Sequence, residues 1–283
     1  MAIIGSMNRL KVVKIKDFGA FLAGELLDDI LLPRRFMPEQ CRIGDELEVF
    51  IYLDSDSLPI ATTLKPKAQV NQFACLKVTD TNRMGAFLDW NMPKDLLVPF
   101  SEQKEKMVTG QFYVVYIFQE KQNYRLVASS KIGKFLNNTP HSYKNGQPVQ
   151  LMIADETDIG YTAIIEEQYM GVLFHQEIQS PVRKGMKLNG FIKRVRPDNK
   201  LDLSLRKPGY NKDAIHSLET IILAKLKESG GFLPLNDHTP PDTIKKIFGI
   251  SKRTFKMALG GLYKKRLIVL VKNGIRQQVN EQA

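Results

Sequence analysis

The chain has 283 residues, of which 43 % are hydrophobic and 25 % are charged. This composition is that of an ordinary globular protein, so it excludes disorder or a collagen-like repeat as the main state of the chain. No stretch approaches the roughly 18 uninterrupted apolar residues of a membrane span, and residues 1–6 lack the basic and apolar regions of a secretory signal. The two cysteines, Cys41 and Cys75, exclude a disulfide scaffold and predict a reducing, cytoplasmic location.

The formal net charge is +11, which favours a polyanionic partner, chiefly nucleic acid. The positive charge is concentrated in the second half of the chain. Residues 183–207 contain nine cations and two acids, and residues 243–280 contain ten cations and no acid. An acid-free run of this length favours phosphate binding over a merely solvated face.

The first half of the sequence contains a duplicated segment. At an offset of 66, fifteen of the 58 positions in residues 8–65 are identical, and residues 19–22 return as residues 85–88. A third copy is weaker and needs small gaps; we align residues 171–175 with residues 95–99. A period near 70 residues is too long for a solenoid and indicates separate domains in tandem.

Each copy has the pattern of five short strands divided by turns, without a segment of helical period. This pattern predicts a small closed barrel of the five-stranded OB type. The expected fold is therefore mainly β, with S1/OB-type barrels at residues 1–68, 69–139 and 140–208, followed by an α+β winged-helix domain at residues 209–283.

The last domain begins with two predicted helices. Apolar residues at spacings of three and four predict a helix over residues 213–228, which the Gly230-Gly231 pair ends. For the second helix, Thr239 is expected as the N-cap and Pro240 as the first helical residue, with Gly249 as the stop signal.

A third helix and a hairpin complete the predicted winged-helix order. Ser251 is expected to cap this helix, which carries basic residues on its outer side and is the usual groove reader of such domains. Gly260-Gly261 is expected either to end this helix or to mark the close approach of another backbone, and close packing is the preferred interpretation. Asn273-Gly274 is expected as the two-residue turn of the hairpin.

Several strand sequences, at residues 17–21, 171–175 and 201–206, resemble those of S1 RNA-binding domains. Three such units followed by a basic winged helix resemble the virulence factor B family of bacterial S1/winged-helix proteins over essentially the whole chain. The resemblance implies an RNA-binding protein with a regulatory role in RNA metabolism or gene expression. Its most specific stretches are residues 88–90, 95–100, 230–235, 251–256 and 262–264.

The S1 resemblance also implies a binding face, with two aromatics of a Phe-Gly-x-Phe strand, a histidine after the next strand and a basic residue near the last hairpin. Strand alternation prevents Phe18 and Phe21 from both pointing inward without a bulge, so at least one is expected to be exposed and able to stack on a base. The residues that match this face are Phe18, Phe21, Phe87, Arg125, His175 and Lys200.

The alignment also predicts where this pattern is broken. Pro33 and Pro99 are expected at the histidine position of the first two repeats, and Gly160 and Ala163 at the aromatic positions of the third. Trp90, the single tryptophan, is expected to pack between domains.

These observations predict a protein that holds single-stranded RNA by phosphate contacts and stacking, with little direct reading of bases. The third barrel and the winged helix are expected to form one continuous cationic track, whereas the slightly acidic first barrel is expected to be structural. The predicted nucleic-acid-binding residues are Lys193, Arg194, Arg196, Lys200, His175, Lys252, Arg253, Lys256, Lys264, Lys265, Lys272, Arg276, Phe18, Phe21, Phe87 and Arg125.

Catalysis is not expected, because the sequence has no zinc-ligand spacing, no phosphate-binding glycine loop and no Gly-x-Ser-x-Gly elbow. No metal, cofactor, small-molecule substrate or membrane is therefore predicted as a partner. Two alternatives remain open. The winged helix could bind duplex DNA as a transcription regulator, or the chain could be a scaffold that docks on a ribosome or nuclease component.

Overall fold

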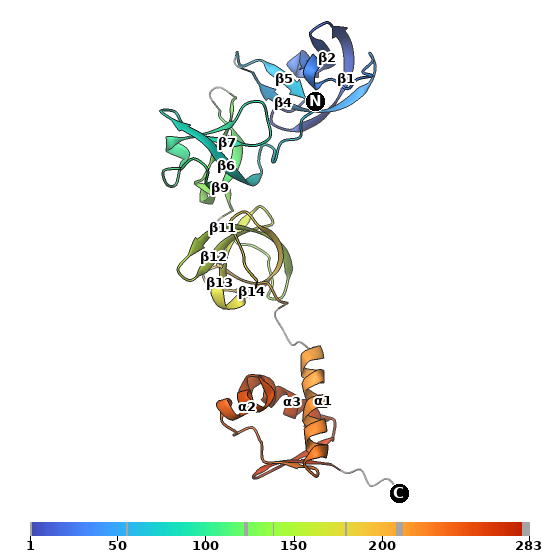
Figure 1. The fold of residues 1–283 in the computed structure, drawn as a ribbon, viewed down its shortest axis with the longest axis vertical. Coiled ribbons are helices and arrows are strands. Elements are labelled where there is room, and N and C mark those ends of the chain that lie inside the picture. The colour runs from blue at the N-terminus through green and yellow to red at the C-terminus, as the bar shows by residue number, and fades with distance from the viewer. Residues whose placement is uncertain are drawn as a thin grey trace. The chain divides into compact units, whose positions relative to one another are not determined.

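In the computed structural model the chain forms two compact units, Met1–Pro208 and Gly209–Ala283 (Figure 1). No helix in the described part of the chain is both long enough and apolar enough to cross a membrane. The described residues are 2–54, 56–121, 124–137, 139–178, 180–207 and 212–278, with side chains described from residue 217 onward in the last range.

The first barrel is a closed sheet with the strand order β1-β2-β3-β5-β4. A bulge between Val12 and Lys14 bends β1, so that its first half pairs with β4 and its second half with β2, which closes the barrel. The strands are β1 (Met7–Lys16), β2 (Gly19–Ala23), β3 (Asp29–Pro33), β4 (Glu46–Leu53) and β5 (Pro59–Thr62).

The second and third barrels repeat this topology, so the predicted fold class of three five-stranded barrels is confirmed. The second consists of β6 (Phe73–Asn82), β7 (Gly85–Asp89), β8 (Leu96–Pro99), β9 (Phe112–Gln119) and β10 (Leu126–Ser129). The third consists of β11 (Pro148–Thr157), β12 (Gly160–Ile165), β13 (Tyr169–Phe174), β14 (Lys187–Val195) and β15 (Leu201–Ser204).

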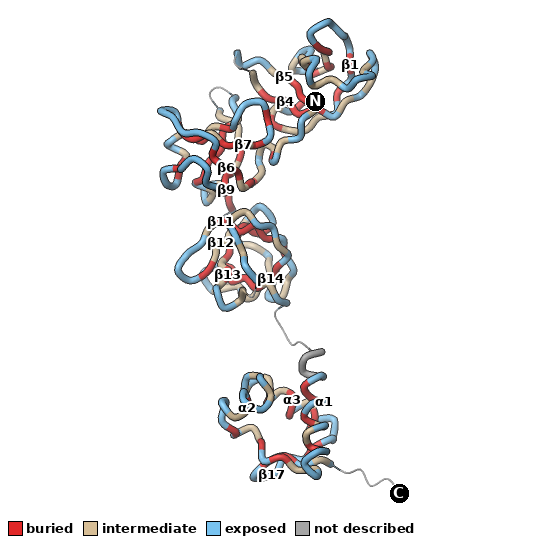
Figure 2. The backbone as a smooth tube through the Cα atoms, in the orientation of Figure 1, coloured by how far each residue is buried: buried red, intermediate tan, exposed pale blue. Residues whose placement is uncertain are grey.

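Each barrel core is built by alternate strand residues, because successive side chains of a strand point to opposite faces of the sheet. In the first barrel Val12, Leu22, Leu32 and Val49 are fully buried inside, and their strand neighbours face outward. Figure 2 shows buried and exposed segments in each of the three barrels. Each fully buried side chain of this size stabilises the fold by about 1.5–3 kcal/mol relative to an exposed one.

The first two barrels pack against each other through an aromatic contact. Trp90, which is 4 % exposed, lies edge-to-face against Phe50 of β4 with ring centroids 5.5 Å apart. Its indole nitrogen donates a hydrogen bond of 2.6 Å to the carbonyl of Lys94. The prediction that Trp90 packs between domains is thus confirmed.

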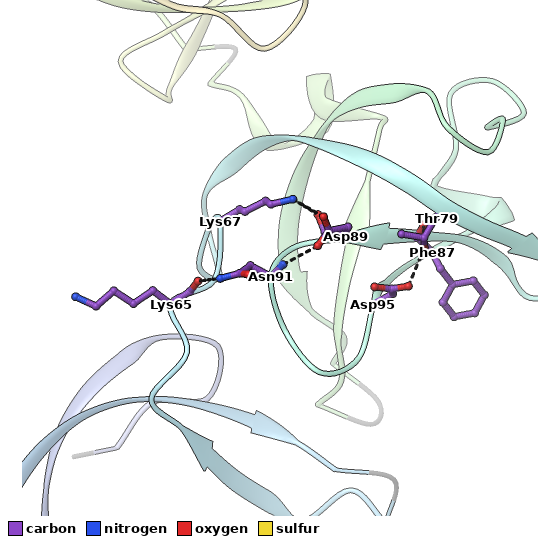
Figure 3. A network of polar contacts seen from close by, with 7 residues as sticks. All are labelled: Lys65, Lys67, Thr79, Phe87, Asp89, Asn91 and Asp95. Atoms are coloured by element: carbon purple, nitrogen blue, oxygen red, sulfur yellow. Dashed lines mark hydrogen bonds and ion pairs between the residues drawn. The ribbon is translucent and has the colours of Figure 1, made fainter. Parts of the chain in front are cut away.

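A polar network fixes the connection between these two barrels (Figure 3). Lys67 forms an ion pair of 2.6 Å with Asp89, and the side chain of Asn91 donates to the carbonyl of Lys65. Hydrogen bonding by Lys67 is the main reason why the pKa of Asp89 lies below its usual value of 3.8.

The second and third barrels share a smaller apolar cluster that includes Phe73, Val114, Met152 and Ile164. Two lysines, one from each barrel, form ion pairs with the carboxylate of Asp155. The distances are 3.2 Å for Lys104 and 2.9 Å for Lys184.

The second unit has the predicted order of helices and hairpin. The Gly230-Gly231 pair adopts positive φ angles of 69° and 83° and ends the first helix, and Ser251 caps the third by accepting from the Thr254 amide, both as predicted. Its elements are α1 (Lys212–Glu228), β16 (Phe232–Leu233), α2 (Pro241–Phe248), α3 (Lys252–Lys264), β17 (Ile268–Val271) and β18 (Gly274–Gln277).

Two local predictions for this unit were wrong by one residue. The N-cap of α2 is Pro240 and not Thr239, because the Thr239 hydroxyl instead accepts the amide of Asn236 in the preceding turn. The hairpin turn is Lys272-Asn273, since Val271 already pairs with Gly274. A Cβ on Gly274 would lie 2.1 Å from the Leu233 carbonyl, so this glycine is needed for the approach of β16, a strand that was not predicted.

Candidate nucleic-acid interface

Strand pairing brings the same three positions together on the outer face of every barrel. Gly19, Gly85 and Gly160 each open the second strand of their barrel and pair with the last residue of the third strand, which is Pro33, Pro99 and Phe174, respectively. The positions that flank these pairs are therefore equivalent in the three barrels. They are Phe18, Phe21 and Arg34 in the first barrel, Met84, Phe87 and Phe100 in the second, and Ile159, Thr162 and His175 in the third.

This register corrects the predicted alignment of the third repeat. The first strands of the second and third barrels begin at Phe73 and Pro148, and the same offset of 75 residues holds without a gap through the last strand. The aromatic positions of the third barrel are consequently Ile159 and Thr162, rather than Gly160 and Ala163. The counterparts of His175 are Arg34 and Phe100, rather than Pro33 and Pro99.

The first barrel carries both members of the predicted aromatic pair, Phe18 and Phe21. Phe18 is 60 % exposed and meets Phe21 edge-to-face, with 6.0 Å between ring centroids, so the expectation that at least one of them is exposed is confirmed. The Lys14 ammonium lies 5.9 Å from the Phe21 ring, and the Arg34 guanidinium donates to the Asp17 carbonyl beside Phe18. Two rings flanked by two cations can stack on bases and hold their phosphates.

On the second barrel, Phe87 and Arg125 line the same pocket, although 38 residues separate them in the sequence. Met84 and Phe100, at the other two equivalent positions, are 55 % and 52 % exposed. Arg125 also reaches toward Ser57 of the first barrel, with 3.5 Å between its guanidinium and the serine hydroxyl.

On the third barrel, three of the predicted cations are held by nearby acids. The ion pairs are Lys193–Glu177 at 2.6 Å, Arg196–Asp202 at 2.6 Å and Lys200–Asp198 at 3.3 Å. Arg194 is exposed and forms no ion pair with any residue that the structure describes. The exposed His175 lies edge-to-face against Tyr161, with ring centroids 5.8 Å apart.

One acid and one arginine of these ion pairs, Glu177 and Arg196, have pKa values that differ from their usual ones. Burial alone would raise the pKa of Glu177, but hydrogen bonds from Lys193 and Ser204 outweigh burial and lower it. The hydrogen bond to Asp202 is the main reason why the pKa of Arg196 is raised. Both ion pairs reduce the net positive charge that this face offers to phosphates.

The predicted cations of the winged helix fall into two groups. Lys252 donates to the His238 carbonyl, Lys256 lies 3.6 Å from Asp237, and Lys265 pairs with the buried Glu219. The other four are exposed and have no acidic partner among the described residues. They are Arg253, Lys264, Lys272 and Arg276.

Sequence reasoning missed a lysine-rich cavity of about 460 Å³ between the second and third barrels. Lys104, Lys131, Lys134 and Lys184 line it, together with Thr162 of the third barrel's outer face. Its lysines come from separate loops spread over 80 residues, so no run of sequence reveals the cluster. The outward positions of Lys14 and Arg34, by contrast, could have been found from strand alternation and the repeat offset.

Comparison with protein families finds two matches, one within each unit. Residues 4–64 match the S1 domain family, and residues 220–276 match the family of CvfB-like winged helix domains. Both are families of nucleic-acid-binding domains rather than of known enzymes, and their presence in one chain supports nucleic-acid binding.

Individual relatives extend this likeness over most of the chain. Conserved virulence factor B of Staphylococcus aureus (strain USA300) is 24 % identical over 94 % of this chain and 91 % of its own length. The uncharacterized protein YitL of Bacillus subtilis (strain 168) is 28 % identical over 92 % of this chain and 89 % of its own length. The predicted resemblance to the virulence factor B family is therefore confirmed.

A solved structure was also found, described as a multidomain protein with nucleic acid binding domains from Streptococcus pneumoniae TIGR4. It is 25 % identical, covers 97 % of this chain and 98 % of its own, and has a TM-score of 0.41.

Proposed function

We propose that this protein binds single-stranded RNA and thereby regulates RNA metabolism or gene expression. The observation that carries the proposal is the outward pair of Phe18 and Phe21 beside Lys14 and Arg34. Exposed rings next to cations suit unpaired bases, which have free π-faces, whereas the bases of a duplex are stacked on one another. The first barrel, which the sequence suggested to be structural, is thus assigned to RNA binding.

The third barrel and the winged helix add phosphate contacts in this proposal. Arg194 on the barrel and Arg253 on α3 are exposed arginines without acidic partners among the described residues, so both can release condensed counterions when they bind phosphates. We propose that a single RNA strand contacts both modules. The regulatory role rests on the likeness to proteins named Conserved virulence factor B. A cytoplasmic location would suit Cys41 and Cys75, which are both free thiols.

Competition between nucleic acids tests the choice of RNA. A labelled single-stranded RNA is bound to the full chain and displaced by unlabelled single-stranded RNA or by a DNA duplex of equal length. The proposal expects the RNA to compete at least about tenfold better, because base stacking adds about 1–3 kcal/mol per base only for unpaired strands. Stronger competition by the duplex would favour a DNA-binding regulator instead.

A triple substitution tests the winged helix. Replacing Lys252, Arg253 and Lys256 by alanine should weaken RNA binding severalfold and reduce the steepness of its salt dependence, because phosphate contacts are lost. Alanine at Arg42, Lys77 and Lys106, which are exposed cations of the first two barrels outside the proposed faces, is the charge-matched control. Equal affinity and equal salt dependence of both triple variants would contradict a role for α3. Weak binding with a shallow salt dependence in the unsubstituted protein would favour a protein-docking scaffold.

A further inference from the structure

A cavity of about 260 Å³ lies where the first two barrels meet. One side is formed by the end of β4, with Tyr52 and Asp54, and the other by Phe87, Leu97 and the loop between β7 and β8. Drug-sized ligands occupy pockets of roughly 300–1,000 Å³, so this cavity is suited to a smaller, flat group such as one nucleobase.

The walls of this cavity are preformed by contacts between the barrels. Trp90 lines the cavity while its ring is packed against Phe50 and its indole nitrogen is bonded to the Lys94 carbonyl. The connection between the barrels is held by the Lys67–Asp89 ion pair. A site whose walls are already ordered spends little conformational entropy on binding.

Asp54, Lys94 and Arg125 line the cavity together with the carboxylate of Asp95, which lies on the wall that carries Phe87. Oδ2 of Asp95 accepts a hydrogen bond of 2.7 Å from the Thr79 hydroxyl, which orients the group next to the Phe87 ring (Figure 3). Oδ1 of Asp95 has no hydrogen-bond partner in the described part of the chain. A fixed carboxylate beside an aromatic wall selects a flat ring that presents N–H donors along its edge.

We propose that this cavity receives one unstacked guanine of the bound RNA, with its N1–H and N2–H groups donating to Asp95. The inference rests on the proposed RNA binding and extends it, because it assigns base selectivity to a protein whose other contacts are to phosphates and base faces. Guanine is the base with two adjacent N–H donors on its pairing edge, which matches the two oxygens of a carboxylate. Uracil presents a single N–H there, between two acceptors that the carboxylate would repel. Arg125 lines the same cavity and contributes positive charge for the phosphate of that nucleotide.

The test uses the full chain and uridine oligonucleotides of about 12 nucleotides, a length within the range that one OB fold covers. One central uridine is replaced by guanosine, or by inosine, which lacks only the N2 amino group. Guanosine should strengthen binding at least about fivefold over uridine, and inosine should lose a large part of that gain, because a well-formed pair of hydrogen bonds discriminates strongly between bases. Equal affinity of the unsubstituted protein for the three oligonucleotides would overturn the proposal.

Two variants distinguish the contact of the Asp95 carboxylate with guanine from a general effect of losing one negative charge. Asp95→Asn should reduce the preference for guanosine to within about twofold while binding of the all-uridine oligonucleotide is retained. Asp29→Asn, at the equivalent position of the first barrel, changes the charge equally outside the cavity and should keep the full preference. A guanosine preference that survives Asp95→Asn would overturn the proposal. If no oligonucleotide binds the unsubstituted protein, the proposed RNA binding fails first, and the guanine site fails with it.

Discussion

Neighbouring cations of this protein differ in whether an acidic side chain pairs with them. Lys264 and Lys265 are adjacent at the end of α3, yet Lys264 is exposed without an acidic partner among the described residues, while Lys265 pairs with Glu219 of α1. The side chain of Glu219 is only 7 % exposed and approaches Gly261, where a Cβ would lie 2.1 Å from its carboxylate. The preferred close packing is therefore confirmed at Gly261, where the approaching group is a side chain and not the predicted backbone, and it is wrong at Gly260, where the space is open.

Replacing each of these two lysines by alanine should therefore have a different effect. Lys264→Ala should leave thermal stability unchanged and reduce the slope of log affinity against log salt by about one, since one phosphate contact is lost. Lys265→Ala should instead destabilise the second unit by about 1–3 kcal/mol, because the buried Glu219 carboxylate loses its cationic partner. Denaturant unfolding and RNA titrations at several salt concentrations measure both effects. The interpretation is wrong if Lys265→Ala is as stable as the unsubstituted protein.

At the scale of elements, the repeat offset decides which side chains share a face. The two matching repeats at an offset of 66 predicted the first two barrels correctly. In the third, few identities remain, and a shift of one residue in a strand of period two moves every assignment to the opposite face. That shift is why Gly160 and Ala163 were assigned in place of Ile159 and Thr162. The partners of the cations were unpredictable for another reason, since acids such as Glu219 lie 46 residues from the lysine they hold.

Equivalent glycines of the barrels offer a matched test of the contact between the second and third barrels. Gly110 and Gly185 precede the fourth strand of their barrels with φ angles of 86° and 81°, so alanine strains the backbone equally at both. Only at Gly185 would the new Cβ meet another barrel, at 2.2 Å from the Cβ of Cys75. Gly185→Ala should therefore be about 1–3 kcal/mol less stable than Gly110→Ala in urea unfolding, the usual cost of overpacking. Equal stability of the two variants would show that this contact does not matter to folding.

At the scale of the whole molecule, the sequence predicted the modules but not the surfaces that they build together. The barrels and the winged helix follow from local strand and helix patterns, which are visible in a single sequence. The cavity with Asp95 and the lysine-rich cavity near Asp155 lie where neighbouring barrels contact each other. Such contacts depend on the shapes of the barrel surfaces, which the hydrophobic periodicity of the sequence does not reveal. The boundaries at residues 68, 139 and 208 stay predictions.

The length of the RNA tests whether several modules hold one strand. If the third barrel and the winged helix bind the same molecule, the second contact is intramolecular and benefits from a high effective concentration. An oligonucleotide of about 24 residues should then bind about 100-fold or more tightly than one of about 8, which engages a single module. Arg194→Ala and Arg253→Ala, one in each module, should each reduce this ratio, whereas Lys106→Ala on the second barrel should not. Additional binding registers alone would supply a gain of up to about 17-fold for a site of about 8 nucleotides. A gain with length no larger than this would show that the modules bind RNA independently of each other.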